Sequence, residues 1–161
     1  SDLSVHNQAQ NFQKEYGVIF LDVDHFKKFN DRNGHPAGDQ VLKMVAQILR
    51  DCSRAQDLPA RYGGEEFVML CRDSDLAETH AQAEKVRAAI YAYDFPFGEH
   101  QPLGRVSVSI GVAAFPVSGG AATEIVKHAD DALYEAKQSG RNRVAVYVPG
   151  TTGDSKSKKS A

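Results

Sequence analysis

The 161-residue chain lacks several features that mark particular classes of protein. It has no tryptophan and only two cysteines, Cys52 and Cys71, whose spacing fits neither a zinc site nor a disulfide framework. Its apolar runs fall well short of the ~20 residues of a membrane helix. The formal net charge is −2, so no general basic field attracts nucleic acid or anionic lipid. A phosphate-binding site must therefore be built from local groups.

The composition that remains is typical of a soluble globular domain. Hydrophobic residues make up 42% of the chain and charged residues 25%, and a chain of this length folds without a disulfide or structural metal. Cys52 lies on the apolar stripe of a predicted helix and Cys71 ends a predicted strand, so both are expected to be buried, reduced thiols. This favours a cytoplasmic location, or the cytoplasmic face of a membrane protein. Neither nucleic acid nor a membrane is expected as a partner of this fragment.

Hydrophobic patterning predicts strands and helices in a mixed order. The apolar run at 17–23 predicts a strand buried on both faces. A polar, glycine-rich loop is predicted at 30–38, followed by Asp39 as the N-cap of a helix that runs to Cys52. The pair Gly63-Gly64 between two apolar segments predicts a β-hairpin. Further elements are predicted as helices at 76–92 and 123–139, a half-buried strand from alternating residues at 106–112, and a last strand at 143–148.

This order, β-α-β-β-α-β-α-β without an internal repeat, predicts an α+β fold with a central mixed sheet flanked by helices. It fits a ferredoxin-like or palm-like core, in which the first strand and the hairpin lie side by side. Residues 1–16 are polar and predict an N-terminal arm or weak helix. Residues 17–149 form the predicted folded domain. Residues 150–161 are rich in Gly, Thr, Ser and Lys, which predicts a disordered tail.

Acidic residues stand where the first strand and the hairpin are expected to meet. Asp22 ends the strand, and Glu65 and Glu66 follow the hairpin glycines. Strand-end acids alone are more often solvated loop residues, but three carboxylates in a small space repel one another, and a hard divalent cation compensates best. Carboxylates that hold Mg2+ beside a nucleotide are the arrangement that phosphoryl or nucleotidyl transfer needs.

Candidate groups for a nucleotide lie nearby in the sequence. Lys27 follows the first strand, while Lys137 and Arg141 stand four residues apart at the end of the last helix, where they suit either phosphate binding or interaction with the helix dipole. Asn30 and Asp39 bracket the glycine-rich loop. A carboxylate accepts both the N1 and N2 protons of guanine, so this pair favours guanine over adenine.

At this point the sequence resembles a known family. The segment Arg61–Phe67 reads Arg-Tyr-Gly-Gly-Glu-Glu-Phe and looks like the signature of the GGDEF family of diguanylate cyclases, in its GGEEF form. Three further segments are similar to the other family motifs and follow in the family's order, at 20–30, 33–39 and 134–142. Four motifs in order over residues 17–148 are specific evidence. The resemblance implies a palm-like GGDEF catalytic domain at 17–149 that condenses two GTP into cyclic di-GMP plus pyrophosphate, as a homodimer of domains.

The resemblance also implies residue roles. Asp22, the backbone carbonyl of Val23, and Glu65 would ligate Mg2+ (or Mn2+), with Glu66 near or on the metal and Glu65 as proton acceptor for the 3′-hydroxyl. Asp24 would be structural. The substrate GTP would be bound by Asn30 and Asp39 at guanine, with His35 nearby, and by Lys27, Lys137 and Arg141 at the phosphates.

A second site is implied upstream of the signature, where the family binds its product as an inhibitor. Arg54-Ala-Gln-Asp57 matches the family's Arg-x-x-Asp pattern, and Arg87 on the next helix is a candidate second arginine. Guanidinium groups suit both the phosphates and the guanine faces of cyclic di-GMP. Without the product, Arg54 and Asp57 also fit an ordinary surface ion pair.

Two alternatives to the cyclase stay open at this point. One is a catalytically silent cyclic di-GMP receptor that uses Arg54 and Asp57; the intact acids of the signature argue against it. The other is a cyclase with an adenine-containing product, against which Asp39 argues. The family normally opens with an Asp-x-Leu-Thr-Gly-Leu-x-Asn-Arg segment and a long helix, which Asp2–Ser4 matches only faintly. We therefore expect an N-terminally truncated chain, with a regulatory domain preceding it in the full-length protein.

Overall fold

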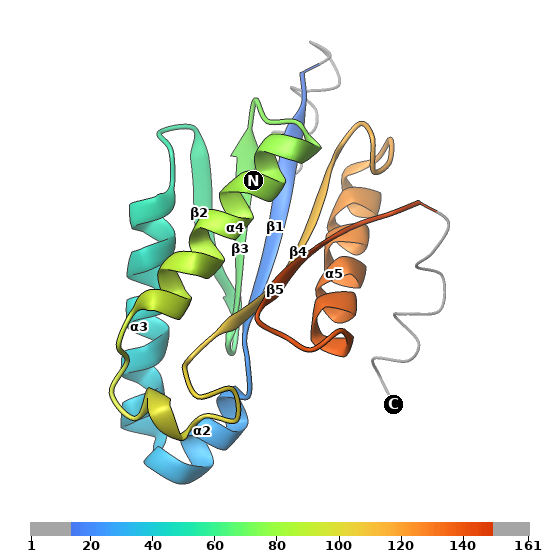
Figure 1. Cartoon of the computed structure of the whole chain (residues 1–161). Coiled ribbons are helices and arrows are strands. Elements are labelled where there is room, and N and C mark those ends of the chain that lie inside the picture. The colour runs from blue at the N-terminus through green and yellow to red at the C-terminus, as the bar shows by residue number, and fades with distance from the viewer. Residues whose placement is uncertain (1–13, 150–161) are drawn as a thin grey trace.

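A mixed sheet with strand order β2-β3-β1-β4-β5 organises residues 14–149, the part of the chain that the computed structural model describes (Figure 1). The elements in chain order are β1 (Tyr16–Val23), α2 (Phe26–Asn33), α3 (His35–Cys52), β2 (Asp57–Gly63), β3 (Glu66–Arg72), α4 (Leu76–Ala92), a 3₁₀ turn (Gly98–His100), β4 (Val108–Phe115), α5 (Ala122–Gln138) and β5 (Arg143–Val146). The predicted mixed sheet flanked by helices is thereby confirmed.

The central strand is β1, and all eight of its residues are buried. It pairs antiparallel with β3 on one side and with β4 on the other, while β5 adds to β4 in parallel. Burial on both faces explains why its sequence is an unbroken apolar run rather than an alternation. The predicted hairpin is also confirmed, since β2 and β3 pair antiparallel across the Gly-Gly turn.

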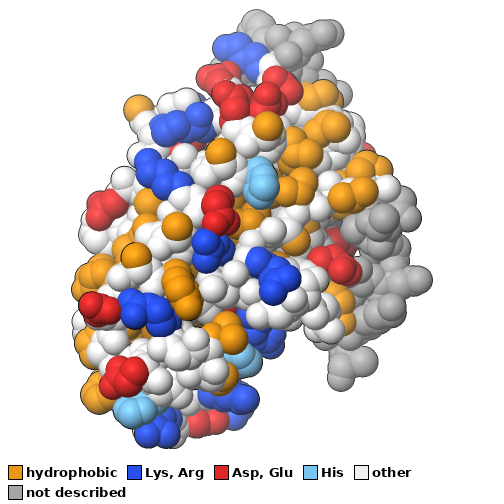
Figure 2. Space-filling view, viewed as in Figure 1, with side chains coloured by type: hydrophobic (Ala, Val, Ile, Leu, Met, Phe, Trp, Pro, Cys, Tyr) orange, Lys and Arg blue, Asp and Glu red, His pale blue; other side chains and the backbone are white. Residues whose placement is uncertain are grey.

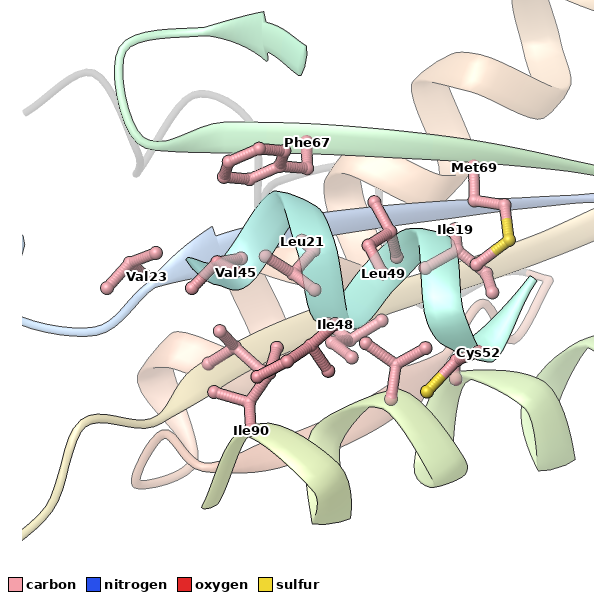
Figure 3. Close-up of a cluster of buried hydrophobic side chains, with 14 of the residues drawn as sticks. Ile19, Leu21, Val23, Val45, Ile48, Leu49, Cys52, Phe67, Met69 and Ile90 are labelled. Carbon is pink, nitrogen blue, oxygen red and sulfur yellow. The ribbon is translucent and has the colours of Figure 1, made fainter. Parts of the chain in front are cut away.

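The two faces of the sheet build two hydrophobic cores. On one face, Ile19, Leu21 and Val23 of β1 contact the apolar sides of α3 and α4, together with Phe67 and Met69 of β3 (Figure 3). On the other face, Val18 and Phe20 pack against α5. Each fully buried aliphatic side chain contributes about 1.5–3 kcal/mol by leaving water. Both layers therefore depend on β1, whose last residues belong to the candidate site.

Helix α5 approaches the sheet at Gly111 of β4 without an intervening side chain. A Cβ atom at this position would overlap the backbone of Ala129 and Leu133. Because neither backbone can move like a flexible side chain, only glycine allows the helix to lie this close. The close approach fixes the height of α5 above β1 and β4.

Gly111→Ala is expected to lower the free energy of unfolding by about 1–3 kcal/mol or more, since the added methyl group forces α5 off the sheet. Urea denaturation followed by circular dichroism measures the change. Gly120→Ala is the matched control, because nothing lies within 4 Å of a Cβ at Gly120 and its φ is not in the left-handed range. Equal stability of the two variants would contradict the close packing.

The prediction of a loop at 30–38 was wrong. Helix α2 occupies Phe26–Asn33 and α3 begins at His35, with Gly34 alone between them. Gly34 has φ 91°, a left-handed value that ends α2, and Pro36 fits the first turn of α3, where its missing N–H costs nothing. The prediction that Asp39 caps this helix was also wrong: the N-cap is Gly34, and Asp39 is an exposed residue of the second turn.

Further expectations concern the last two strands, the cysteines and the two ends of the chain. The strand predicted as half-buried at 106–112 is β4, and all eight of its residues are buried, because α5 covers one face and α4 contacts the other. The last strand ends at Val146 rather than at 148. Cys52 and Cys71 are buried free thiols, as predicted. The predicted arm at 1–16 falls mostly, and the tail at 150–161 entirely, outside the described residues.

The surface carries charges of both signs. Figure 2 shows Lys and Arg side chains interspersed with Asp and Glu over the face that it presents. Within residues 14–149, no helix is both long and apolar enough to cross a membrane.

Candidate active site

The end of β1 and the Gly-Gly turn lie side by side. The register of β1 and β3 places Asp22 opposite Glu66, so both side chains project from the same face of the sheet. The backbone N–H of Val23 donates a hydrogen bond to the carbonyl of Glu65 over 3.3 Å. The predicted convergence of the strand-end acid with the two hairpin acids is therefore found.

The turn between β2 and β3 is open above its glycines. A Cβ at Gly63 or Gly64 would meet no atom within 4 Å, and Gly64 has φ 51°. Arg61 fixes the turn, because its guanidinium donates two hydrogen bonds to the carbonyl of Gly64, over 3.0 and 2.6 Å. The backbone here leaves room for a ligand to approach closely.

Asp22 is a buried carboxylate with an uncommon electrostatic environment. Asp22 is 4% exposed, and its pKa is raised from 3.8 to about 6. Burial is the main cause, the Lys137 ammonium opposes the rise, and the charges of Glu65 and Glu66 add to it. Lys137 reaches across from α5 and donates a hydrogen bond to Oδ2. The other oxygen, Oδ1, is buried without a hydrogen-bond partner. An unpartnered buried carboxylate oxygen is costly, and it marks a place where a ligand would be bound.

The donor set at this point fits a hard divalent cation. Within residues 14–149, no three His, Cys, Asp or Glu side chains stand close enough to form a metal cage by themselves. The Oδ1 of Asp22 is, however, without a partner and lies within electrostatic range of the Glu65 and Glu66 carboxylates. Carboxylate and backbone carbonyl oxygens, such as that of the neighbouring Val23, are the ligands that hard cations take. The site therefore suits Mg2+ or Mn2+ held by few protein groups, with further ligands supplied by water or substrate.

Helices α2 and α3, which follow β1 in the chain, carry four of the residues predicted to contact the substrate. Asn30 is half-buried against α3, where a Cβ at Gly38 would overlap its amide. His35 and Asp39 are exposed near the start of α3. Lys27 is also exposed and pairs with Asp31 over 2.9 Å. The close packing of Asn30 on Gly38 fixes that amide relative to α3, and the exposed side chains are accessible to a ligand.

The end of α5 brings two cations to the same region. Lys137 contacts Asp22, and Arg141 donates a hydrogen bond from Nη1 to the carbonyl of Lys137 over 3.3 Å. The pKa of His25, in the turn after β1, is lowered from 6.5 by burial and then by the charges of Arg141 and Lys28. Arg141 therefore lies close to the β1–α2 turn, as a joint phosphate site requires.

Arg54 and Asp57 form a partly buried, two-point ion pair at the start of β2. The guanidinium donates from Nε and Nη2 to the two carboxylate oxygens over 3.1 and 2.8 Å, and the backbone N–H of Arg54 adds a third bond. The Asp57 side chain is fully buried, whereas that of Arg54 is 35% exposed. Ser74 accepts a further hydrogen bond from Arg54. The pair is fixed in place, while part of the Arg54 side chain remains exposed to solvent.

Arg87 makes other contacts than those expected of it. Its guanidinium donates to Glu84 and to the side chain of Asn142, and none of its described contacts joins it to Arg54 or Asp57. Burial raises the pKa of the Cys52 thiol at the end of α3, and the charge of Lys85, also on α4, opposes that rise. Lys85 and Arg87 project from different sides of the helix, because they stand two residues apart.

Arg54→Ala is expected to lower the free energy of unfolding by about 2–3 kcal/mol, because it leaves the buried Asp57 carboxylate without its main partner. The value lies below that of a fully buried pair, since the backbone N–H still bonds Asp57 and Arg54 is partly exposed. Urea denaturation at pH 7 gives the change. Arg54→Ala/Asp57→Asn should recover part of the loss, and no recovery would contradict an ion-pair origin.

Comparison with known proteins identifies the class to which this site belongs. A family model described as "Diguanylate cyclase, GGDEF domain" matches residues 2–143. The chain therefore belongs to the GGDEF domain family.

Individual relatives agree with this assignment. Diguanylate cyclase A of Treponema denticola is 38% identical over 140 residues, which cover 87% of this chain and 37% of the relative. The probable diguanylate cyclase DgcT of Escherichia coli is 43% identical over 140 residues, covering 86% of this chain and 31% of the relative. The chain thus spans about a third of the length of these curated relatives.

Solved structures confirm the palm-like nucleotidyl cyclase fold. The active GGEEF domain of a diguanylate cyclase from Vibrio cholerae matches with a TM-score of 0.83 and 26% identity, covering 92% of this chain and 93% of that one. The GGDEF domain of DgcB from Caulobacter crescentus, in complex with c-di-GMP, matches with a TM-score of 0.80 and 32% identity, covering 91% and 83%.

Proposed function

We propose that this chain is a diguanylate cyclase domain that condenses two GTP into cyclic di-GMP and two pyrophosphates. The observation that carries the proposal is the buried Asp22 carboxylate, with one oxygen free, beside the acids of an intact GGEEF turn and against Lys137. A cation site next to an open glycine turn and a pair of basic side chains suits a nucleoside triphosphate. The named cyclases among the relatives support the same reaction.

The proposed metal is Mg2+, or Mn2+ in its place. Asp22, the carbonyl of Val23, and Glu65 would hold it, with Glu66 near or on it. When bound, the cation neutralises phosphate charge and lowers the pKa of an attacking hydroxyl. The free Oδ1 of Asp22 supports this assignment, because it is the kind of unpartnered, buried oxygen that a hard cation satisfies.

The remaining residues are proposed to bind the two ends of GTP, its guanine base and its triphosphate. Asn30 and Asp39 would bind the guanine edge, with His35 nearby. Lys27, Lys137 and Arg141 would hold the triphosphate. The 3′-hydroxyl oxygen of one GTP forms a bond to the α-phosphorus of the other, and the bond from that phosphorus to the β-phosphate oxygen breaks. Pyrophosphate leaves, and the hydroxyl proton passes to the carboxylate of Glu65.

The reaction requires two copies of the domain. Each copy would bind one GTP, and in two copies facing each other across a twofold axis the 3′-hydroxyl of each GTP would attack the α-phosphate of the other, with release of two pyrophosphates. Formation of both new bonds follows from the symmetry of this homodimer. A preceding regulatory domain would raise the effective concentration of one copy near the other. The substrate and the reduced thiols fit a cytoplasmic enzyme.

Product inhibition is proposed at Arg54 and Asp57. The fixed, partly exposed Arg54 side chain suits recognition of cyclic di-GMP, and the GGDEF domain of DgcB from Caulobacter crescentus was solved in complex with c-di-GMP. The contacts of Arg87 with Glu84 and Asn142 give no support to its sequence-based role as a second product-binding arginine.

Incubation of the chain with GTP and Mg2+, followed by nucleotide chromatography, tests the proposed function. Cyclic di-GMP should form at a rate that rises faster than linearly with protein concentration, because two domains must meet. A chain that forms no product at any concentration but binds added cyclic di-GMP would be a receptor instead. Repeating the assay with ATP tests base choice, and product from ATP would contradict the roles of Asn30 and Asp39.

A further inference from the structure

The turn between α5 and β5 has an uncommon backbone conformation. Three consecutive residues have positive φ: Gly140 at 120°, Arg141 at 64° and Asn142 at 47°. Two of them are not glycine, and such residues rarely adopt the left-handed region. A conformation of this kind persists only where neighbouring groups hold it, and it often marks a functional site.

A buried carboxylate holds this turn from the β1 side. Asp24 Oδ2 accepts hydrogen bonds from the backbone N–H of Asn142 over 3.0 Å and from Ser107 Oγ over 2.7 Å. Its Oδ1 accepts from Ser109 Oγ over 2.6 Å. Asp24 thus ties the end of β1, the start of β4 and the turn together by charge-assisted bonds. This agrees with the structural role predicted for it.

Arg87 holds the same turn from α4. Its Nη1 donates to Asn142 Oδ1 over 2.8 Å, across 55 residues of sequence. Glu84 fixes the guanidinium itself, accepting from Nε and Nη2 over 3.0 and 2.6 Å. The Arg87 side chain is 19% exposed, so water competes little for these bonds. Asn142 is therefore held by its backbone on one side and by its side chain on the other.

The residue held in place by these contacts is Arg141. Its backbone N–H donates to the carbonyl of Ala136, and its guanidinium reaches the carbonyl of Lys137. The position of the Arg141 side chain therefore depends on how the turn leaves α5, whereas Lys137 lies within the helix itself. We propose that Arg87 is a positioning residue for triphosphate binding, acting through Asn142 on Arg141; this inference rests on the proposed function.

The proposal predicts a loss that depends on the phosphates. In Arg87→Met the side chain of Asn142 loses its donor, and residues 141–142 can relax toward ordinary φ values, which moves the guanidinium of Arg141. Affinity for a non-hydrolysable α,β-methylene analogue of GTP should fall about five- to tenfold, the usual effect of one intramolecular hydrogen bond. Affinity for guanosine, which lacks phosphates, should not change.

Isothermal titration of the chain in Mg2+ measures both affinities. Arg72→Met is the control for loss of a partly buried arginine, because Arg72 donates a hydrogen bond to the carbonyl of Gln56 at the opposite end of the fold. Arg87→Lys keeps a donor for Asn142 and should recover part of the loss. Asn142→Ala should reproduce Arg87→Met, and the double variant should lose no more than either single one. If Arg87→Met does not fold, Asn142→Ala and Arg87→Lys carry the same comparison.

Several results would overturn the positioning role of Arg87. Equal weakening of guanosine and of the GTP analogue, or additive effects of Arg87→Met and Asn142→Ala, would overturn the inference. So would a variant that loses cyclic di-GMP binding and keeps GTP affinity, since Arg87 would then serve the product site. A parent chain that binds no GTP analogue would instead overturn the proposed function, which the parent measurement reveals by itself.

Discussion

Replacing Glu65 with glutamine is expected to lower the rate of cyclic di-GMP formation by about 10²- to 10⁴-fold, the usual range for loss of a proton acceptor. Glutamine has nearly the same shape but cannot accept the proton of the 3′-hydroxyl, and it is a weaker ligand for a divalent cation. The backbone carbonyl of Glu65, which accepts from Val23, is unaffected. The fold should therefore remain intact.

Initial rates at saturating GTP and equal protein concentration measure the effect, with circular dichroism to compare the folds. Glu99→Gln is the control, since Glu99 is an exposed acid outside the β1–β3 site. A Glu65→Gln variant that retains a tenth or more of the parent rate would rule out the proposed role of this carboxylate.

Asp22→Asn is expected to have opposite effects on activity and on stability. The variant should lose cyclase activity, because the proposed cation loses its most buried ligand. In the absence of divalent cations at pH 8, it should nevertheless unfold with a free energy about 1–3 kcal/mol higher than the parent. The reason is that burial, with Glu65 and Glu66 nearby, makes the ionised Asp22 carboxylate unfavourable in the folded chain.

The pH dependence follows from the raised pKa of Asp22. The folded chain holds this proton up to about pH 6, whereas the unfolded chain releases it near 3.8. The folded state therefore binds more protons in this window, and the parent loses stability as pH rises from about 4 to 6. The advantage of Asp22→Asn should be small at pH 4 and fully developed above pH 6.

Urea denaturation at a series of pH values, with and without Mg2+, tests this prediction. Mg2+ should stabilise the parent more than the variant, because the variant lacks the buried Asp22 carboxylate and keeps only Glu65 and Glu66. Asp31→Asn is the matched control, since Asp31 is an exposed acid with a lysine partner four residues away. A parent that gains stability between pH 4 and 6 relative to Asp22→Asn would contradict the raised pKa.

The sequence predicted those parts of the fold that have a strong hydrophobic pattern. The apolar run of β1 predicts only a buried strand, and the glycine pair between two apolar segments predicts only a hairpin. Helix α2 was missed because Phe29 is its only buried residue, so no apolar stripe reveals it. The alternation in β4 suggested one exposed face, whereas its small residues are what allow α5 to cover that face.

The candidate site was predicted where its residues lie close in sequence or at the ends of paired strands. The meeting of Asp22 with the hairpin acids followed from a register that the fold class implies. The contact of Lys137 with Asp22 joins residues 115 positions apart, and that of Arg87 with Asn142 depends on how α4 crosses the sheet. Such pairings follow from helix placement, which side-chain periodicity does not specify.

The glycine contact between α5 and β4 has a consequence for how such a domain can diverge. The helix that carries Lys137 rests directly on sheet backbone at Gly111, so residues beneath it cannot change size without moving it. Helices α2 and α3 present His35 and Asp39 on an exposed surface instead. We therefore expect the proposed guanine contacts near the start of α3 to tolerate substitution without loss of the fold, whereas the residues on which α5 rests tolerate little change in size.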